Sequence, residues 1–358
     1  MSSITKGAAV AIRNLYLDRY LDSRTTSPKV DAWSLDIPIW EIPPILNPFY
    51  SDGVDLYAAI MYRLPYENIK FLTVLGLLVD AKDREIDLSD KPLVEATSGN
   101  TGIALGYLGV AHPFNAPGVI LVVNSDLPDG KRDPLVLTGA EIIHPRPGMS
   151  GIATARAMHK EGVARNLDQY ANPAGYRIHE FLTGPAVFEE LPEKSIDVLV
   201  ADIGTGGTVI GLSRFFKQQL GDNNVTVVGA LLEDGEEVPG VRDRARMKEV
   251  SLPWEKAVNQ VVEVPKDPCY RLAAIDHRFG GVTGGPSSGM VRVAANRFLA
   301  GEKLAGRLDS HRHNDGRVRV LMVFPDGSRA YGDRFMANVP FHTKPEWFVP
   351  PFSWELFS

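Results

Sequence analysis

Three short polar loops in the sequence each follow an apolar run and precede a helical pattern. The first runs from Thr97 to Gly102 and contains three hydroxyls, one amide and two glycines. The residues just before it read as a short strand, and residues 103–110 read as the start of a helix. Small hydrogen-bonding groups packed at a strand-to-helix turn indicate a place where the chain holds a polar ligand.

The second loop, residues 202–211, is rich in glycine ("DIGTGGTVIG"). Its glycines leave backbone N–H groups free to point at one small anion, and a helix N-terminus adds favourable potential. Position 209 is Val and no Gly-Lys-Ser/Thr follows, so neither a dinucleotide fingerprint nor a P-loop is present. The loop suits a single phosphate, although a tight turn that needs glycines explains it equally well. The residues concerned are Gly204, Thr205, Gly206, Gly207 and Thr208.

Lys70 lies among apolar residues at the predicted start of a helix, where Asn68 is a sensible cap. Such a lysine either extends its charge to water or is partly desolvated. Desolvation lowers the pKa of the amine and makes it a nucleophile able to form a Schiff base. The third loop, residues 280–290, brings Ser287 and Ser288 to the start of another helix, where a simple N-cap is the alternative reading. Together, a buried lysine, hydroxyls, a phosphate loop and a serine able to meet a ring nitrogen are what pyridoxal phosphate needs.

Strand and helix patterns alternate from about Leu56 to Phe324, which predicts an α/β protein whose parallel-type sheets are covered by helices on both faces. The chain has 358 residues, about right for two domains. We also expect a helical N-terminal arm, and an aromatic C-terminal tail (341–358) packed on the body or on a partner.

Composition excludes several classes of function. The net charge is −6 with no basic block, so we expect no nucleic-acid or membrane partner. The single cysteine, Cys269, suits a reducing compartment, and no apolar run is long enough to span a bilayer. A cytoplasmic enzyme without a metal site is expected.

Several motifs resemble the cysteine synthase family, the fold-type II pyridoxal-phosphate enzymes that include cystathionine β-synthase. "LVEATSGNTGIAL" is similar to the family's substrate-carboxylate loop, "GTGGT" to its phosphate loop and "PSSGM" to its serine-rich turn. Residues 169–185 and "FPDGSRAYGDRF" resemble two further family segments, and Lys70 precedes Asn100 by the spacing expected of the Schiff-base lysine. The resemblance covers roughly four-fifths of the chain.

The resemblance implies a fold and a set of roles. It implies two three-layer αβα domains like those of tryptophan synthase β, with the cofactor in the interdomain cleft. Residues 1–75 would form the arm and part of the large domain, 76–180 the small substrate-binding domain, and 181–358 the large cofactor-binding domain. A homodimer is also implied. The substrate carboxylate would be held by Thr97, Ser98, Asn100, Thr101 and Gln169.

Further roles follow from the same resemblance. Asn100 would also bond the phenolic oxygen of the cofactor. Ser287 would bond the ring nitrogen without protonating it, and Ser288 would cap the helix. Lys70 would carry the cofactor and then act as the base that removes the α-proton.

The sequence departs from the family around Lys70, where only the preceding proline and the lysine itself survive, and the Gly-Ile-Gly loop of the acetylserine enzymes is absent. The stretch after residue 234 is closer to the branch that uses O-phosphoserine. Arg242 matches by position the arginine that binds substrate phosphate in that branch. Arg244 and Arg246 are expected to lie in a solvated, charged loop.

The function implied is β-replacement on O-phosphoserine or O-acetylserine through an aminoacrylate, with sulfide, thiosulfate or another small nucleophile. A β-lyase or deaminase acting on a serine- or cysteine-like amino acid, and a regulatory homologue with altered catalysis, are the alternatives. A dinucleotide-binding oxidoreductase would share the sheet, but both glycine loops lack its fingerprint.

Overall fold

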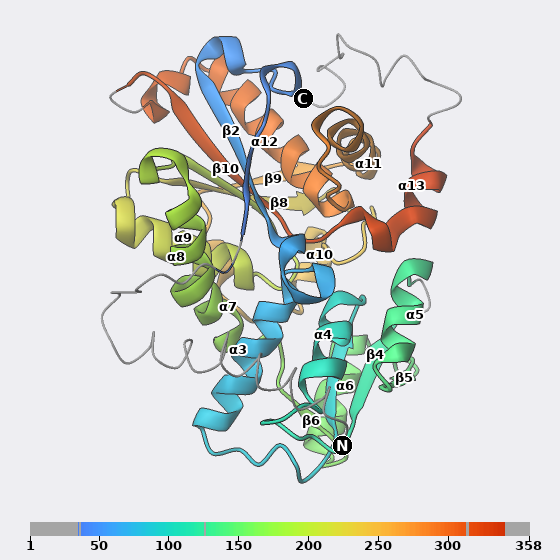
Figure 1. The fold of residues 1–358 in the computed structure, drawn as a ribbon. Helices are drawn as coiled ribbons and strands as arrows, with labels where there is room; N and C mark the ends of the chain where they lie inside the picture. The colour runs from blue at the N-terminus through green and yellow to red at the C-terminus, as the bar shows by residue number, and fades with distance from the viewer. Residues whose placement is uncertain (1–34, 36, 125–126, 313–314, 341–358) are drawn as a thin grey trace.

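The structure, a computed structural model, describes residues 35, 37–124, 127–312 and 315–340 and contains two sheets (Figure 1). The larger sheet has the strand order β1-β2-β10-β7-β8-β9 and the smaller one β5-β4-β3-β6. All neighbouring strands are parallel except β1 and β2. The strands of the larger sheet are β1 (Ile39–Glu41), β2 (Val54–Ile60), β7 (Val198–Asp202), β8 (Thr226–Leu232), β9 (Gln260–Val264) and β10 (Val318–Phe324), and those of the smaller sheet are β3 (Leu93–Thr97), β4 (Val119–Val123), β5 (Glu141–Ile143) and β6 (Arg165–Asn166).

Helices cover both faces of the larger sheet because its strands are apolar on both faces. Along β7, Val198 and Val200 pack in the same cluster as helices α11 (Lys266–Ile275) and α12 (Pro286–Leu304). The alternate residues, Leu199 and Ala201, face the opposite cluster. That second cluster contains helices α3 (Lys70–Asp83), α7 (Ala174–Ile178), α8 (Gly184–Glu190) and α9 (Gly207–Leu220).

The smaller sheet is built in the same way. Val94 and Val122 pack against α6 (Gly151–Lys160), while Leu93 and Leu121 face α4 (Asn100–Leu108) and α5 (Asp129–Leu137). Two short helices, α10 (Arg244–Met247) and α13 (Gly332–Asn338), follow β8 and β10. Both sheets are therefore the middle of three layers.

The strand register places the C-terminal ends of three strands at the same edge of the larger sheet. Phe324 lies opposite Ile60, and Met322 lies opposite Val200, so β2, β7 and β10 end at the same level. The segments that follow these ends carry Lys70, Asp202 and Asp326. Helix α3 packs against α4 and α7 and so joins the larger sheet to the smaller one (Figure 1).

Most of the predicted architecture is confirmed, with a few differences. The two mainly parallel, three-layer sheets are present, but β1 is antiparallel, and β9 and α11 were not predicted. The expectation that Ser288 caps its helix is wrong, because α12 begins at Pro286 after the N-cap Gly285. The domain boundaries and the homodimer stay predictions. The predicted N-terminal arm and aromatic tail lie outside the described residues.

Within the described part of the chain, no helix is both long enough and apolar enough to cross a membrane.

Candidate active site

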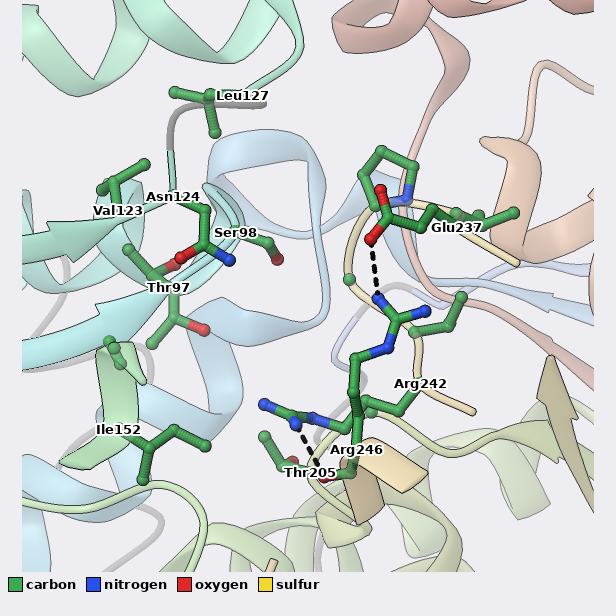
Figure 2. A pocket seen from close by; sticks show the side chains of 18 of the residues that line it. Thr97, Ser98, Val123, Asn124, Leu127, Ile152, Thr205, Glu237, Arg242 and Arg246 are labelled. Carbon is green, nitrogen blue, oxygen red and sulfur yellow. Dashed lines mark hydrogen bonds and ion pairs between the residues drawn. The ribbon is translucent and has the colours of Figure 1, made fainter. Parts of the chain in front are cut away.

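A cavity of about 580 Å³ lies where residues from both sheets meet. Figure 2 shows Thr97, Ser98 and Ile152 on one side of it, facing Thr205 and Arg242 on the other. A second cavity shares part of this lining and extends to Asn100, the glycine loop, Ser287 and Asp326. The two cavities together bring in every site residue predicted from the sequence except Gly207, namely Lys70, Thr97, Ser98, Asn100, Thr101, Gln169, Gly204, Thr205, Gly206, Thr208, Arg242 and Ser287.

Lys70 lines both cavities and is the first residue of α3. Asn68 Oδ1 accepts the backbone N–H of Lys70 at 3.0 Å, but the predicted N-cap position is off by one, because the N-cap of α3 is Ile69. Burial lowers the pKa of the Lys70 amine, against the opposing charges of Asp202 and Asp326. The side chain is therefore partly desolvated, and its neutral form is more accessible than that of a surface lysine.

The glycine loop precedes the N-terminus of α9, where its backbone N–H groups could hold an anion. Gly206 has φ +82°, a conformation that favours glycine, and a Cβ on Gly204 would lie 2.6 Å from the carbonyl oxygen of Gly240. Thr208 Oγ1 lies 3.5 Å from Nε2 of the buried His179, whose pKa is lowered to about 3 by burial and which is therefore neutral at pH 7. Gly207 lines neither cavity and instead packs against the backbone of Gly175.

The hydroxyls of the first loop have different tasks. Thr97 Oγ1 accepts the backbone N–H groups of Gly99 and Gly102 at 3.0 and 3.1 Å, which shapes the turn. Thr101 Oγ1 donates to Gln169 Oε1 at 2.9 Å. A hydroxyl has one hydrogen, so the Thr101 side chain does not donate to a ligand in this arrangement. The hydroxyls of Thr97 and Ser98 and the backbone N–H groups of the turn can still meet a carboxylate.

Glu95 lies in the strand that leads into this loop. Its buried carboxyl should make the stability of the protein depend on pH. Its carboxyl accepts the backbone N–H groups of Ala96 and Gln169 at 3.1 and 3.2 Å, and burial raises its pKa from 4.5 to about 8. The folded protein therefore holds a proton that the unfolded chain releases, so the free energy of unfolding falls as pH rises from about 4.5 to about 8. Each unit of pKa shift corresponds to about 1.4 kcal/mol.

Glu95→Gln should remove this dependence, so its stability relative to wild type should increase between pH 5 and pH 8 in urea unfolding. The exposed Glu255→Gln is the matched control. A Glu95→Gln difference that stays constant over this pH range would contradict the assignment.

The arginines after β8 do not all behave as expected. Arg242 lines the larger cavity and is held by its neighbours: Nη1 donates to the carbonyl oxygen of Arg246 at 2.9 Å, and the guanidinium lies 4.9 Å from the centre of the Tyr170 ring. The expectation that Arg246 is merely solvated is wrong, because it also lines the cavity and pairs with Asp243 and Glu237. Arg244 pairs with Glu263 and is not part of the lining.

Sequence reasoning missed two buried groups at or near the second cavity. Asp326 lines it, and Lys131, fully buried on α5, lies 3.7 Å from the Asp326 carboxylate. Burial lowers the pKa of Lys131 to about 8, yet this lysine lines neither cavity. One feature of the sequence could have indicated Asp326: it begins the polar turn that follows the last apolar strand.

Comparisons with known proteins identify the family. The profile described as "Pyridoxal-phosphate dependent enzyme" matches residues 38–326. The chain belongs to this family of pyridoxal-phosphate-dependent enzymes. Cysteine synthase B of Salmonella typhimurium is 31% identical over 253 residues, covering 68% of this chain and 81% of that protein. Cysteine synthase A of Escherichia coli K12 is 29% identical over 305 residues, covering 80% and 88%.

Solved structures share the fold at lower sequence identity. Cysteine synthase from Entamoeba histolytica superposes with a TM-score of 0.70 at 19% identity, covering 90% of this chain and 96% of that one. O-ureido-L-serine synthase gives a TM-score of 0.70 at 17% identity, covering 87% and 95%. The fold is that of the type II pyridoxal-phosphate enzymes.

The site fits the cofactor of this family. A desolvated lysine lines the same cavity as a glycine loop that has no room for a Cβ at Gly204, and Ser287 lines that cavity too. These groups match the aldehyde, the phosphate and the ring of pyridoxal phosphate. The enzyme depends on this cofactor.

Proposed function

We propose that this enzyme catalyses β-replacement on an O-activated L-serine, with Lys70 as both the cofactor-bearing lysine and the base. The observation that carries the proposal is the position of Lys70: it lines both cavities, together with Gly204 and Thr205 of the glycine loop and Ser98 of the first loop. The similarity to cysteine synthases A and B supports the reaction class.

Each group of residues in the site has a separate role in this reaction. Bound pyridoxal phosphate supplies the electron sink for the charge left when the α-proton is removed. Thr97, Ser98 and the backbone of their turn hold the substrate carboxylate and so orient the Cα–H bond toward Lys70. The Lys70 amine takes the proton, because desolvation keeps its neutral form accessible. The leaving group on Cβ then departs toward the cavity wall that carries Arg242.

The arginine in this part of the cavity indicates which O-activated serine the enzyme prefers. The Arg242 side chain is only 15% exposed and is fixed by Tyr170 and by the backbone of Arg246. A fixed guanidinium binds phosphate through two charge-assisted hydrogen bonds. We therefore infer that O-phosphoserine is preferred to O-acetylserine, by about 2 kcal/mol on the scale of hydrogen bonds to charged groups.

Arg242→Ala should therefore lower kcat/KM for O-phosphoserine by about 30-fold more than for O-acetylserine, at about 1.4 kcal/mol per decade. Steady-state kinetics with both donors measures this. Arg244→Ala, which removes a neighbouring arginine outside the cavity, should leave the ratio unchanged. Equal losses with both donors, or a wild-type preference for O-acetylserine, would sink the assignment.

Product analysis tests the reaction itself. The wild-type enzyme is incubated with each donor and a panel of sulfide, thiosulfate, a thiol and an amine, and the products are identified by mass. A β-substituted alanine that forms in proportion to the nucleophile supports the proposal. Pyruvate and ammonia at a rate independent of the nucleophile would instead indicate a β-lyase.

A further inference from the structure

We propose that the nucleophile of this enzyme is an organic thiol with a negatively charged group, and that Lys266 and Arg334 bind this group on one wall of the larger cavity. The inference rests on the proposed β-replacement and names the class of its second substrate. Sulfide, thiosulfate, thiols and amines are all open from the sequence, and this wall distinguishes among them.

Helices α11 and α13 form the wall. Lys266 and Tyr270 of α11 line the larger cavity, as do Arg334 and Asn338 of α13. The members of each pair are at positions i and i+4, so each pair lies on one face of its helix. The two helices pack together, with the rings of Tyr270 and Phe335 in an edge-on contact at 5.4 Å between centroids (Figure 1). Two cationic side chains therefore share this wall.

The charges of the lining leave Lys266 available to a ligand. Five basic and two acidic residues line the larger cavity, namely Lys70, Arg242, Arg246, Lys266, Arg334, Glu237 and Glu249. Both acidic residues pair with arginines, Glu249 with Arg242 at 3.7 Å and Glu237 with Arg246 at 3.3 Å. Arg334 pairs with its neighbour Asp333. Within the described part of the chain, the Lys266 side chain has no ion pair or hydrogen bond, so its ammonium group can bind an anion.

The anionic groups of the donor have other partners in the proposed reaction. The α-carboxylate is assigned to Thr97, Ser98 and the backbone of their turn, and the phosphate is assigned to Arg242. The remaining substrate is the nucleophile, so an anion bound by the α11–α13 wall belongs to it. The similarity to cysteine synthases A and B, whose named product contains sulfur, supports a sulfur nucleophile.

The strand order indicates how long this nucleophile is. Lys266 follows the end of β9, and the start of α3 lies beside the end of β10, because the N–H of Ile69 donates to the carbonyl oxygen of Pro325 at 2.8 Å. The order β10-β7-β8-β9 separates these strand ends by three spacings, or about 14 Å. Sulfide is too small to contact Lys266 and also react beside Lys70. A thiol with several bonds between its sulfur and its charged group can do both.

The reaction with such a thiol is balanced. The Cβ–O bond of O-phosphoserine breaks, and the leaving phosphate takes the electron pair of that bond. The sulfur forms the new bond to Cβ, and the thiol proton leaves with the phosphate. The proton that was removed from Cα is returned to it. The product is a thioether of cysteine with a second charged group, and no oxidant or reductant is consumed.

Matched pairs of thiols test the inference. The loaded enzyme and a serine donor are given mercaptopropionate, mercaptobutyrate or mercaptohexanoate, and in parallel the alcohol that matches each acid. For the chain length that fits best, kcat/KM of the acid should exceed that of its alcohol by about tenfold, on the scale of one hydrogen bond to a charged group. Lys266→Met should remove this preference, because it keeps the bulk of the side chain and removes its charge. Arg334→Met should reduce the preference.

Lys256→Met is the matched control, since Lys256 is exposed and lines neither cavity. It should keep the wild-type ratio of acid to alcohol. A wild-type ratio near one at every chain length would overturn the inference. A preference for the acid that survives in Lys266→Met would also overturn it, even if both rates fall, because the lysine would then serve the donor or the fold.

Binding measurements separate this inference from the proposed function. In methylthio acids and alcohols a methyl group blocks the sulfur, so these analogues bind without reacting, and calorimetry with the loaded enzyme compares their affinities. Tighter binding of the acids that Lys266→Met abolishes, with no β-substituted alanine from any nucleophile, would support this subsite and contradict β-replacement. Turnover of sulfide without tighter binding of any acid would support the proposed function and overturn this inference.

Discussion

Replacing Lys70 with alanine should abolish turnover of O-activated serine while the protein still binds pyridoxal phosphate through the glycine cradle. The proposed function gives this lysine two tasks, to carry the cofactor and to remove the α-proton, and Lys70 lines both cavities. Loss of a general base alone costs roughly 10²–10⁴-fold. We expect a larger loss here because the covalent attachment is lost too. Steady-state turnover and cofactor absorbance of the purified variant measure the two effects separately.

The control for this substitution lies on the same helix. Lys82 is exposed near the C-terminal end of α3, so Lys82→Ala should keep full activity and cofactor content. A Lys70→Ala enzyme that retains turnover within tenfold of wild type would show that another group is the base.

The second large effect is expected at Gly204, where an alanine should prevent normal cofactor binding. A Cβ there would lie 2.6 Å from the carbonyl oxygen of Gly240, which is backbone and cannot move aside alone. Both residues line both cavities, so relieving the contact displaces the cradle itself. Real Cβ atoms do not approach so closely, and overpacking typically costs 1–3 kcal/mol. We expect the dissociation constant of pyridoxal phosphate to rise by roughly tenfold to a hundredfold, at about 1.4 kcal/mol per decade.

Gly301→Ala makes the matching change where nothing is crowded. Gly301 lies on α12, and apart from its own helical turn no described residue comes within 4 Å of a Cβ at this position, so cofactor affinity should be unchanged. Cofactor titration of the apo forms compares the two variants. Wild-type affinity in Gly204→Ala would refute the role of this loop as the phosphate cradle.

Those parts of the candidate site that lie in contiguous residues could be predicted from the sequence alone. The loops of residues 97–102 and 202–211 each combine a strand end, glycines and hydroxyls, so their positions follow from one short pattern. Lys70 was found because its apolar neighbours predict burial, and burial lowers its pKa as expected.

The remaining parts depend on contacts between distant segments. Asp326 and Lys131 meet across 195 positions of sequence, and only the strand register places Asp326 beside Ser287 and Asn100. Lys131 gave no signal because its own helix is polar around it. Arg244 and Arg246 look alike in the sequence, since both lie in the same charged stretch. In the fold, Arg246 lines the cavity whereas Arg244 pairs with Glu263. The strand β9 was missed because polar residues interrupt its apolar positions.

The most direct test is to find which lysine carries the cofactor. The loaded enzyme is reduced with borohydride, digested and mapped by mass spectrometry to find the pyridoxyl group. We expect the adduct on Lys70, which lines both cavities. Lys131 is the informative competitor, since it is also buried with a pKa lowered to about 8 but lines neither cavity. An adduct on Lys131, or on any lysine other than Lys70, would contradict the account.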